Sequence, residues 1–273
     1  MNRILWGVFF INILVISLYI FASFLGLNLN ISNILKLLFL ILPIILLFLH
    51  SMYSLGKIRG LVFIVLASLT GLGSEIWALK TGTIFGGHYI YQPSGLMIFN
   101  VPLIVIFFWG VFIYTGYCIT NSFLYWLNKT KPNRKKNNIL FLPLLVLFDG
   151  LFVVAIDLFM DPIEVKAGAW HWLGGGAYFG IPIGNFIGWF LVTILVTGIY
   201  RLFEYYFFGE QHKIDKKIFL IPVIGYTAIC VSLTVSALNL QLLSLAVIGL
   251  LLMPPTIIAN LFLFNNWNSK IKS

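Results

Sequence analysis

Long apolar runs separated by short polar segments make up most of this chain. A membrane-spanning helix needs about 20 apolar residues, and eight runs reach roughly that length: 4–26, 34–56, 60–80, 100–127, 138–159, 185–208, 218–239 and 241–264. Only Asn239, Leu240 and Gln241 separate the last two. The pattern predicts an all-α fold, a polytopic membrane helical bundle of about eight transmembrane helices, formed by residues 1–273 as a single integral membrane domain.

Composition supports this class and excludes a soluble globular protein. The 273 residues are 60% hydrophobic and 9% charged, with a mean hydropathy of +1.01, which is more apolar surface than a soluble core of this size could bury. The first run is longer than the apolar part of a secretion signal and no convincing cleavage site follows it, so we expect it to be retained. Cys118 and Cys230 fall inside apolar runs and indicate packing rather than a disulfide or a metal pair.

The basic residues predict the orientation in the membrane. If the N-terminus is cytoplasmic, fourteen of the 17 Lys and Arg residues, Arg201 among them, fall on the inner side, and only Lys36, Lys80 and Lys166 fall outside. Under the positive-inside rule we expect a multi-pass protein of the cell membrane with cytoplasmic N- and C-termini. The basic segment 129–136 contributes to the net charge of +9, and we interpret it as an orientation and anionic-lipid feature, so no nucleic acid is expected as a partner.

Two segments, each formed by a loop between predicted spans and the adjoining span ends, resemble each other and are rich in glycine and polar aromatic residues. The first contains Glu75, Gly82, Gly86, His88, Tyr89, Tyr91, Pro102 and Trp109, and the second contains Asp161, Gly168, Trp170, His171, Trp172, Tyr178, Gly180, Pro182 and Trp189. In both copies the tryptophan follows the proline by seven residues. We expect an internal repeat of spans 3–4 and 5–6, related by an axis along the membrane normal, with both loops on the external side. Each proline is expected in the first turn of the returning helix.

Acidic residues inside predicted spans are the candidate catalytic residues, because a charge at the bilayer centre costs roughly 2.5–3.5 kcal/mol on insertion scales. Glu75 lies near the outer end of the third span, Asp149 near the middle of the fifth, and Asp157 and Asp161 one turn apart at its outer end. Because all four could not be ionised cheaply in one apolar pocket, we expect at least one to hold a proton and to act as a donor.

Structural explanations compete with this one. Glu75 and Asp161 could instead pair with Lys80 and Lys166 at the interface, and Asp149 could be a buried structural hydrogen-bonding residue. His88 and His171 could donate protons, position water or only hydrogen-bond at the interface. We expect Glu164 to be solvated, His50 and His212 to be incidental, and the first two and last two spans to be a lipid-facing scaffold.

The spacing of Asp157 and Asp161 also allows a magnesium–diphosphate site, as in membrane prenyltransferases. Those enzymes resemble one another in having two aspartate-rich motifs at the cytoplasmic face, whereas this chain has one pair, at the opposite predicted face. No zinc-binding spacing, glycine-rich phosphate loop or serine nucleophile elbow is present in the sequence. We therefore expect no metal site and no nucleotide chemistry.

Residues 60–200 resemble the integral-membrane carotenoid biosynthesis family, whose best-described members are carotenoid hydratases. The matching residues are Glu75, Thr81-Gly82, Phe85-Gly86, Tyr89, Tyr91, Val101-Pro102-Leu103, Asp161-Pro162, Gly168, Trp170, Trp172, Tyr178 to Pro182, Asn185-Phe186 and Gly188-Trp189. The resemblance implies addition of water to the terminal double bond of an acyclic carotenoid end group, without a cofactor. It also implies a carotenoid or other long isoprenoid lipid as the bound partner within the bilayer, and association with other membrane enzymes of the pathway.

Such a reaction needs a neutral acid, a base for the attacking water and aromatic faces that stabilise a tertiary cation. We expect Asp161 or Asp157 to be the acid and Glu75 to be the base. The expected substrate-binding residues are Tyr89, Tyr91, Trp109, Trp170, Trp172, Tyr178, Asn185, Trp189, His88 and His171. Two alternatives stay open: a membrane lycopene cyclase, which begins with the same protonation but closes a ring, and a carotenoid-binding or transport protein without catalysis.

Overall fold

The computed structural model describes residues 2–25, 32–93, 95–127, 134–207 and 216–272. Residues 129–133 of the basic segment, His212 and Lys213 lie outside these ranges. The helices are α1 (Asn2–Phe24), α2 (Ser32–Ser54), α3 (Lys57–Thr81), α4 (Leu103–Leu127), α5 (Arg134–Ala167), α6 (Ile183–Phe207), α7 (Leu220–Asn239), α8 (Leu243–Leu252) and α9 (Pro254–Lys272), with a short 3-10 helix at Lys216–Phe219.

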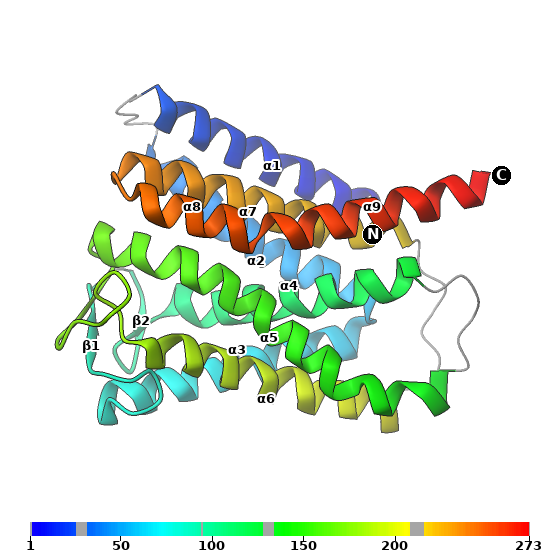
Figure 1. Cartoon of the computed structure of the whole chain (residues 1–273), viewed down its shortest axis with the longest axis horizontal. Coiled ribbons are helices and arrows are strands. Elements are labelled where there is room, and N and C mark those ends of the chain that lie inside the picture. Colours follow the sequence, from blue (N-terminus) through cyan, green and yellow to red (C-terminus); the bar gives the residue numbers. More distant parts are fainter. Residues whose placement is uncertain (1, 26–31, 94, 128–133, 208–215, 273) are drawn as a thin grey trace.

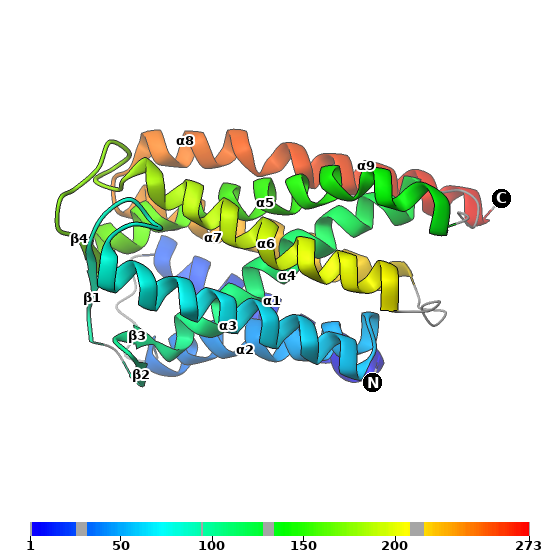
Figure 2. The same ribbon diagram turned by 90° about the horizontal axis from the view of Figure 1, so that it is seen from below.

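These helices run lengthwise through the molecule (Figure 1). Within the described ranges, eight helical segments are long and apolar enough to cross a membrane, which confirms the predicted all-α membrane bundle. The loops before α4 and α6 lie at one end, called the loop end below, and the two chain termini lie toward the other (Figure 1). Seen from below, α2 and α3 follow one edge and α8 and α9 the other, with α4 and α6 between them (Figure 2).

The eighth predicted span is interrupted. Residues predicted as one helix over 241–264 form α8 and α9, which meet at Met253. The next two residues are Pro254 and Pro255, and proline has no N–H with which to continue the helical hydrogen bonds. The two helices remain nearly in line, so together they form one span, Leu243–Asn268.

Helix α5 is longer than its predicted span of 138–159. It runs from Arg134 to Ala167 and contains Pro143 and Pro162. Asp161 therefore lies inside the helix rather than at its end. The expectation that Glu164 is solvated is wrong, because its side chain is partly buried and lines the cavity described below.

The two similar loops pair with each other through short strands that the hydrophobic pattern did not predict. β1 (Tyr89–Tyr91) runs antiparallel to β4 (Trp170–Trp172), with Tyr89 opposite Trp172 and Tyr91 opposite Trp170. A second pair joins β2 (Met97–Ile98) to β3 (Val101–Pro102) directly before α4. Pro102 thus ends a strand and Pro182 precedes α6, so neither lies in the first helical turn as expected.

Equivalent residues of the two copies meet between α4 and α6. The rings of Trp109 and Trp189 stack with their centroids 3.6 Å apart. Asn121 and Arg201, each twelve residues further along, also contact each other, with Arg201 Nη1 donating to Asn121 Oδ1 at 3.0 Å. Contacts between equivalent residues are what a two-fold axis between these parallel helices would produce, so this geometry fits the expected repeat.

A glycine pair brings the first loop onto the start of α6. Gly86 has a φ of 76°, a conformation that favours glycine. A Cβ atom added at Gly86 would lie 2.8 Å from Gly184 Cα. The backbones can approach this closely only without side chains, and the approach positions the first loop over the residues that begin α6.

Candidate functional site

Three acidic side chains from two helices meet inside the bundle near the loop end. Glu75 from α3 and Asp157 and Asp161 from α5 are each at most 3% exposed, and all three line the same cavity. Asn185 from α6 bridges the two aspartates, since its Nδ2 donates to Asp157 Oδ2 at 3.0 Å and to Asp161 Oδ2 at 2.8 Å. These three acidic residues are called the carboxyl cluster below. The structure therefore brings together three of the four predicted acids.

Neutral donors surround Glu75. The hydroxyls of Tyr89 and Tyr91 donate to Oε2, the latter at 2.9 Å, and Trp109 Nε1 donates to Oε1 at 3.0 Å. Burial and the neighbouring Glu75 carboxyl raise the pKa of both tyrosine hydroxyls well above their ordinary range, so both keep their protons and act as donors. The alternative that Glu75 pairs with Lys80 is wrong: within the described ranges its partners are these three aromatic residues.

The two aspartates differ in how completely they are hydrogen-bonded. Asp161 Oδ1 accepts a hydrogen bond from Trp170 Nε1 at 2.6 Å, so Asp161 is held by the second loop and not by Lys166. Asp157 Oδ1 is buried and has no hydrogen-bond partner in the described part of the chain, and the same holds for Trp172 Nε1. Buried polar atoms are normally hydrogen-bonded. These two free atoms therefore mark where a bound molecule could add contacts.

The acids of the carboxyl cluster form no ion pair within the described ranges, and the buried Arg201 pairs with Asp149 instead. Isolated charges are costly away from water, and several like charges in one small space cost still more. The cluster therefore holds at least one proton when its surroundings are apolar. A carboxyl group that keeps its proton in this cluster could donate it to a bound molecule.

The cavity behind the carboxyl cluster has a volume of about 300 Å³. Its walls come from the cluster region and from α1, α2, α4 and α7, through apolar side chains such as Phe9, Leu46, Phe108, Ile229 and Leu233. The expectation that the first two spans and the seventh form only a lipid-facing scaffold is therefore wrong. Their inward faces supply apolar walls of the cavity.

The predicted aromatic walls are mostly in place. Tyr89, Tyr91, Trp170, Trp172 and Trp189 all line the cavity. Trp109 stacks behind Trp189 and is fully buried. The Tyr178 hydroxyl donates to Leu158 O at 2.9 Å, outside the cavity wall; burial and the nearby Asp157 carboxyl raise its pKa to about 12.

The two loop histidines do not reach the carboxyl cluster. Successive side chains of a strand point to opposite faces, and in this strand pair Tyr89 and Trp172 point inward. His88 and His171 are exposed and are absent from the cavity wall. The geometry thus does not bring them to the place where a proton donor or a water-positioning residue would act.

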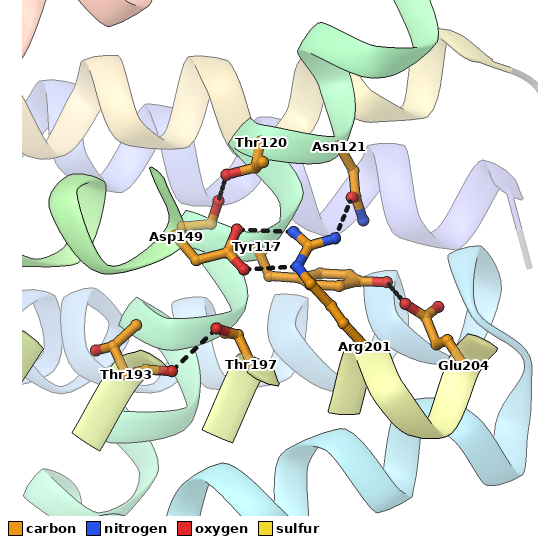
Figure 3. Close-up of polar contacts among 9 residues, drawn as sticks. Tyr117, Thr120, Asn121, Asp149, Thr193, Thr197, Arg201 and Glu204 are labelled. Atoms are coloured by element: carbon orange, nitrogen blue, oxygen red, sulfur yellow. Dashed lines mark hydrogen bonds and ion pairs between the residues drawn. The ribbon is translucent and has the colours of Figure 1, made fainter. Parts of the chain in front are cut away.

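The fourth predicted acid, Asp149, belongs to a separate buried network (Figure 3). Arg201 donates to it through Nε and Nη2, both at 2.7 Å. The guanidinium lies 4.4 Å from the centroid of the Tyr117 ring, and the Tyr117 hydroxyl donates to Glu204 at 2.7 Å. Asp149 does not line the cavity, so its placement fits the structural alternative.

The sequence reasoning missed the structural role of Arg201. It counted this residue only as an orientation charge, and the structure shows its side chain 6% exposed and ion-paired with Asp149 inside the bundle. A signal was available: Trp189, Thr193, Thr197 and Arg201 recur every four residues and form one polar stripe on α6.

His50 is not incidental either. Its Nε2 donates to Ile218 O at 3.1 Å, which leaves Nδ1 to accept from the Tyr114 hydroxyl at 2.8 Å. Both His50 and Tyr114 line the cavity, and His50 lies near the C-terminal end of α2.

In the described ranges, no group of three or more His, Cys, Asp or Glu side chains is arranged to hold a metal ion.

Residues 35–255 match the model of a family described as carotenoid biosynthesis protein. No curated protein and no solved structure matches the sequence significantly. The matched region begins in α2 and ends in α9, so it contains all three acids of the carboxyl cluster, while α1 lies outside it.

Proposed function

Because the chain belongs to the carotenoid biosynthesis protein family, we propose that it is an enzyme that adds water to the terminal carbon–carbon double bond of an acyclic carotenoid end group. The observation that carries this proposal is Asp157 Oδ1, a buried carboxyl oxygen with no hydrogen-bond partner in the described chain. It belongs to a residue on the wall of an apolar cavity that Asp161 and Glu75 also line.

The acid in this mechanism is Asp157. It transfers its proton to the less substituted carbon of the double bond, whose π electrons form the new C–H bond, and a tertiary cation remains on the other carbon. The oxygen of a water molecule bonds to this cation, and Glu75 takes the proton that the water releases. One proton leaves the carboxyl cluster and one enters it, so return of that proton from Glu75 to Asp157 completes the cycle without a cofactor.

Aromatic faces would stabilise the cation between these two steps. Trp172 and Tyr89 lie with ring centroids 4.7 Å apart, and Tyr91 and Trp170 lie 5.8 Å apart. Cation–π attraction contributes about 2 kcal/mol or more when the partners are desolvated. Trp172 Nε1, which has no partner within the described ranges, is available to hold the attacking water.

The membrane setting suits this substrate class. The apolar walls from α1, α2, α4 and α7 would hold the polyene while its end group reaches the carboxyl cluster. On the basis of the basic residues, the proposal places the loop end outside and both termini in the cytoplasm. Substrate and product both stay in the bilayer, which favours association with other membrane enzymes of the same pathway.

Co-expression with an acyclic carotenoid pathway in a pigment-free host tests the proposal, with chromatography and mass spectrometry of the extracted pigments. We expect a product heavier than its substrate by one water. We also expect none from Asp157→Asn at equal membrane abundance. A cyclic product of unchanged mass would support the cyclase alternative, and unaltered pigment that copurifies with the protein would support a binding or transport role.

A further inference from the structure

A polar side chain stands on the cavity wall contributed by α1. Asn12 lies near the middle of this helix, is 4% exposed and lines the cavity. Its Oδ1 has no hydrogen-bond partner among the described residues. An amide oxygen without a partner is unfavourable in an apolar interior, so Asn12 is poorly explained as a packing residue.

The other polar side chains of this part of the cavity are satisfied by the protein. Ser232 Oγ donates to Ile229 O at 2.9 Å, and Thr115 Oγ1 donates to Val111 O at 2.7 Å. Both ring nitrogens of His50 are engaged. Asn12 differs from them in offering an acceptor atom that nothing in the described chain uses.

Asn12 and the carboxyl cluster line the same cavity from different helices. Helix α1 packs against α2 and α7 and lies at the edge of the bundle opposite α3 and α6 (Figure 1). Helices α1 and α3 each pack against α2, so Asn12 and Glu75 reach the cavity that both line from different helices. A molecule extending across the cavity would meet the carboxyl cluster at one place and Asn12 at another.

We infer that Asn12 is a binding residue for a hydroxyl group on the isoprenoid ligand, at a position separate from its reacting double bond. An amide oxygen accepts hydrogen bonds, so its ligand must carry a hydrogen-bond donor, O–H or N–H. A hydroxyl group meets this need without bringing a charge into the apolar cavity, whereas a pure hydrocarbon offers no donor. The inference rests on the proposed function in one respect: it takes the reacting end group to lie at the carboxyl cluster.

Competition binding tests the inference. The purified full chain in detergent is loaded with an acyclic carotene, whose polyene quenches tryptophan fluorescence when bound near Trp170, Trp172 and Trp189. All-trans acyclic isoprenoid alcohols of increasing length are then compared with the hydrocarbons of the same length as competitors. We expect the alcohol to bind about tenfold more tightly than its hydrocarbon at one chain length, as for one ordinary hydrogen bond.

The matched variants are Asn12→Leu, which keeps the branching and the number of heavy atoms of the side chain, and Ser17→Ala, which changes an exposed residue of the same helix. Asn12→Leu should remove the preference for alcohols and leave hydrocarbon binding intact, whereas Ser17→Ala should keep the preference. Equal binding of alcohols and hydrocarbons by the unmodified chain, or a preference that survives Asn12→Leu, overturns the inference and leaves the proposed function standing. Failure of the carotene itself to bind overturns both.

Discussion

The hydrogen bonds around each acidic residue separate an acid from a base within the carboxyl cluster. Glu75 accepts hydrogen bonds from three aromatic donors, and donors directed at a carboxyl group favour its charged form. Asp157 accepts one, from Asn185, and keeps a free oxygen. Glu75 is therefore suited to receive a proton from water, and Asp157 is suited to give one to an alkene that cannot accept a hydrogen bond in return.

We predict that Glu75→Gln lowers product formation at least about 100-fold, as expected for loss of a general base. Tyr89→Phe keeps the ring and removes one of three donors, so its loss should be smaller, about tenfold. Initial rates of pigment conversion in isolated membranes, normalised to the amount of protein, provide the measurement. Ile90→Val, an exposed position between the two tyrosines, is the control; a rate for Glu75→Gln equal to that of the control would remove Glu75 from the mechanism.

A second residue-scale prediction concerns the bridge between the aspartates. Asn185→Leu removes both hydrogen bonds that the Asn185 amide donates to Asp157 and Asp161 and keeps the branching and the number of heavy atoms of the side chain. We expect activity to fall about 10- to 100-fold, since two hydrogen bonds of about 1 kcal/mol or slightly more are lost. Asn185→Asp, which would add a further acid beside two others, should be worse. Activity of either variant equal to that of the unmodified chain contradicts the bridging role.

At the scale of helices and loops, close packing at glycines holds these side chains in place. A Cβ atom added at Gly71 would lie 2.3 Å from Trp109 Cγ, whereas one added at Gly73 on the same helix would meet nothing within 4 Å. Trp109 in turn donates to Glu75 and stacks on Trp189. The absence of a side chain at Gly71 therefore determines where an entire row of aromatic residues can lie.

From this difference we predict opposite outcomes for two substitutions of equal size. Gly71→Ala should displace Trp109 and reduce activity. It should also lower the free energy of unfolding in detergent by about 1–3 kcal/mol, as for other overpacked interiors. Gly73→Ala should be neutral or slightly stabilising, because alanine favours the helix by about 1 kcal/mol. Tryptophan fluorescence reports displacement of the ring. Equal effects of the two substitutions would show that the Gly71 contact does not position Trp109.

The elements also show what a sequence pattern can predict. Hydropathy located the eight spans because lipid requires long apolar helices. It did not predict β1 and β4, because strands of three residues inside glycine-rich loops have no periodic pattern to detect. The meeting of Glu75 with Asp157 and Asp161 was predictable, since costly charges gather in protein interiors. Their hydrogen-bond partners, which depend on the pairing of the two loops, were not.

For the molecule as a whole, the hardest feature to predict was which helices enclose the cavity. Lipid and an isoprenoid-binding chamber are both apolar, so a helix facing either shows the same composition. The inward side chains of α1, α2 and α7 therefore looked like scaffold until their packing was known. That residues 1–273 form a single domain stays a prediction. Asn12 in α1 and His50 in α2 are polar residues inside apolar helices, and they were the sequence signals that these helices face the cavity.

The Arg201–Asp149 ion pair connects α5, which supplies both aspartates of the carboxyl cluster, to α6, which supplies the bridging Asn185. Asp149 lies on the same helix as Asp157 and Asp161, and Arg201 on the same helix as Asn185. Two hydrogen bonds of 2.7 Å join them inside the bundle. This ion pair lies far from the loops, so it fixes the relation of α5 and α6 at a second point along their length.

We predict that Arg201→Leu lowers the free energy of unfolding by about 3–5 kcal/mol, because it leaves the Asp149 charge buried and uncompensated. The double variant Asp149→Leu/Arg201→Leu should recover most of that loss, since two apolar residues can replace a buried ion pair at little cost. Thermal unfolding in detergent measures stability, and pigment conversion at a permissive temperature measures function. If the double variant is stable yet inactive, the ion pair aligns α5 with α6; if it is stable and active, glycine contacts and loop pairing suffice for that alignment. A double variant no more stable than Arg201→Leu would contradict the buried-charge explanation.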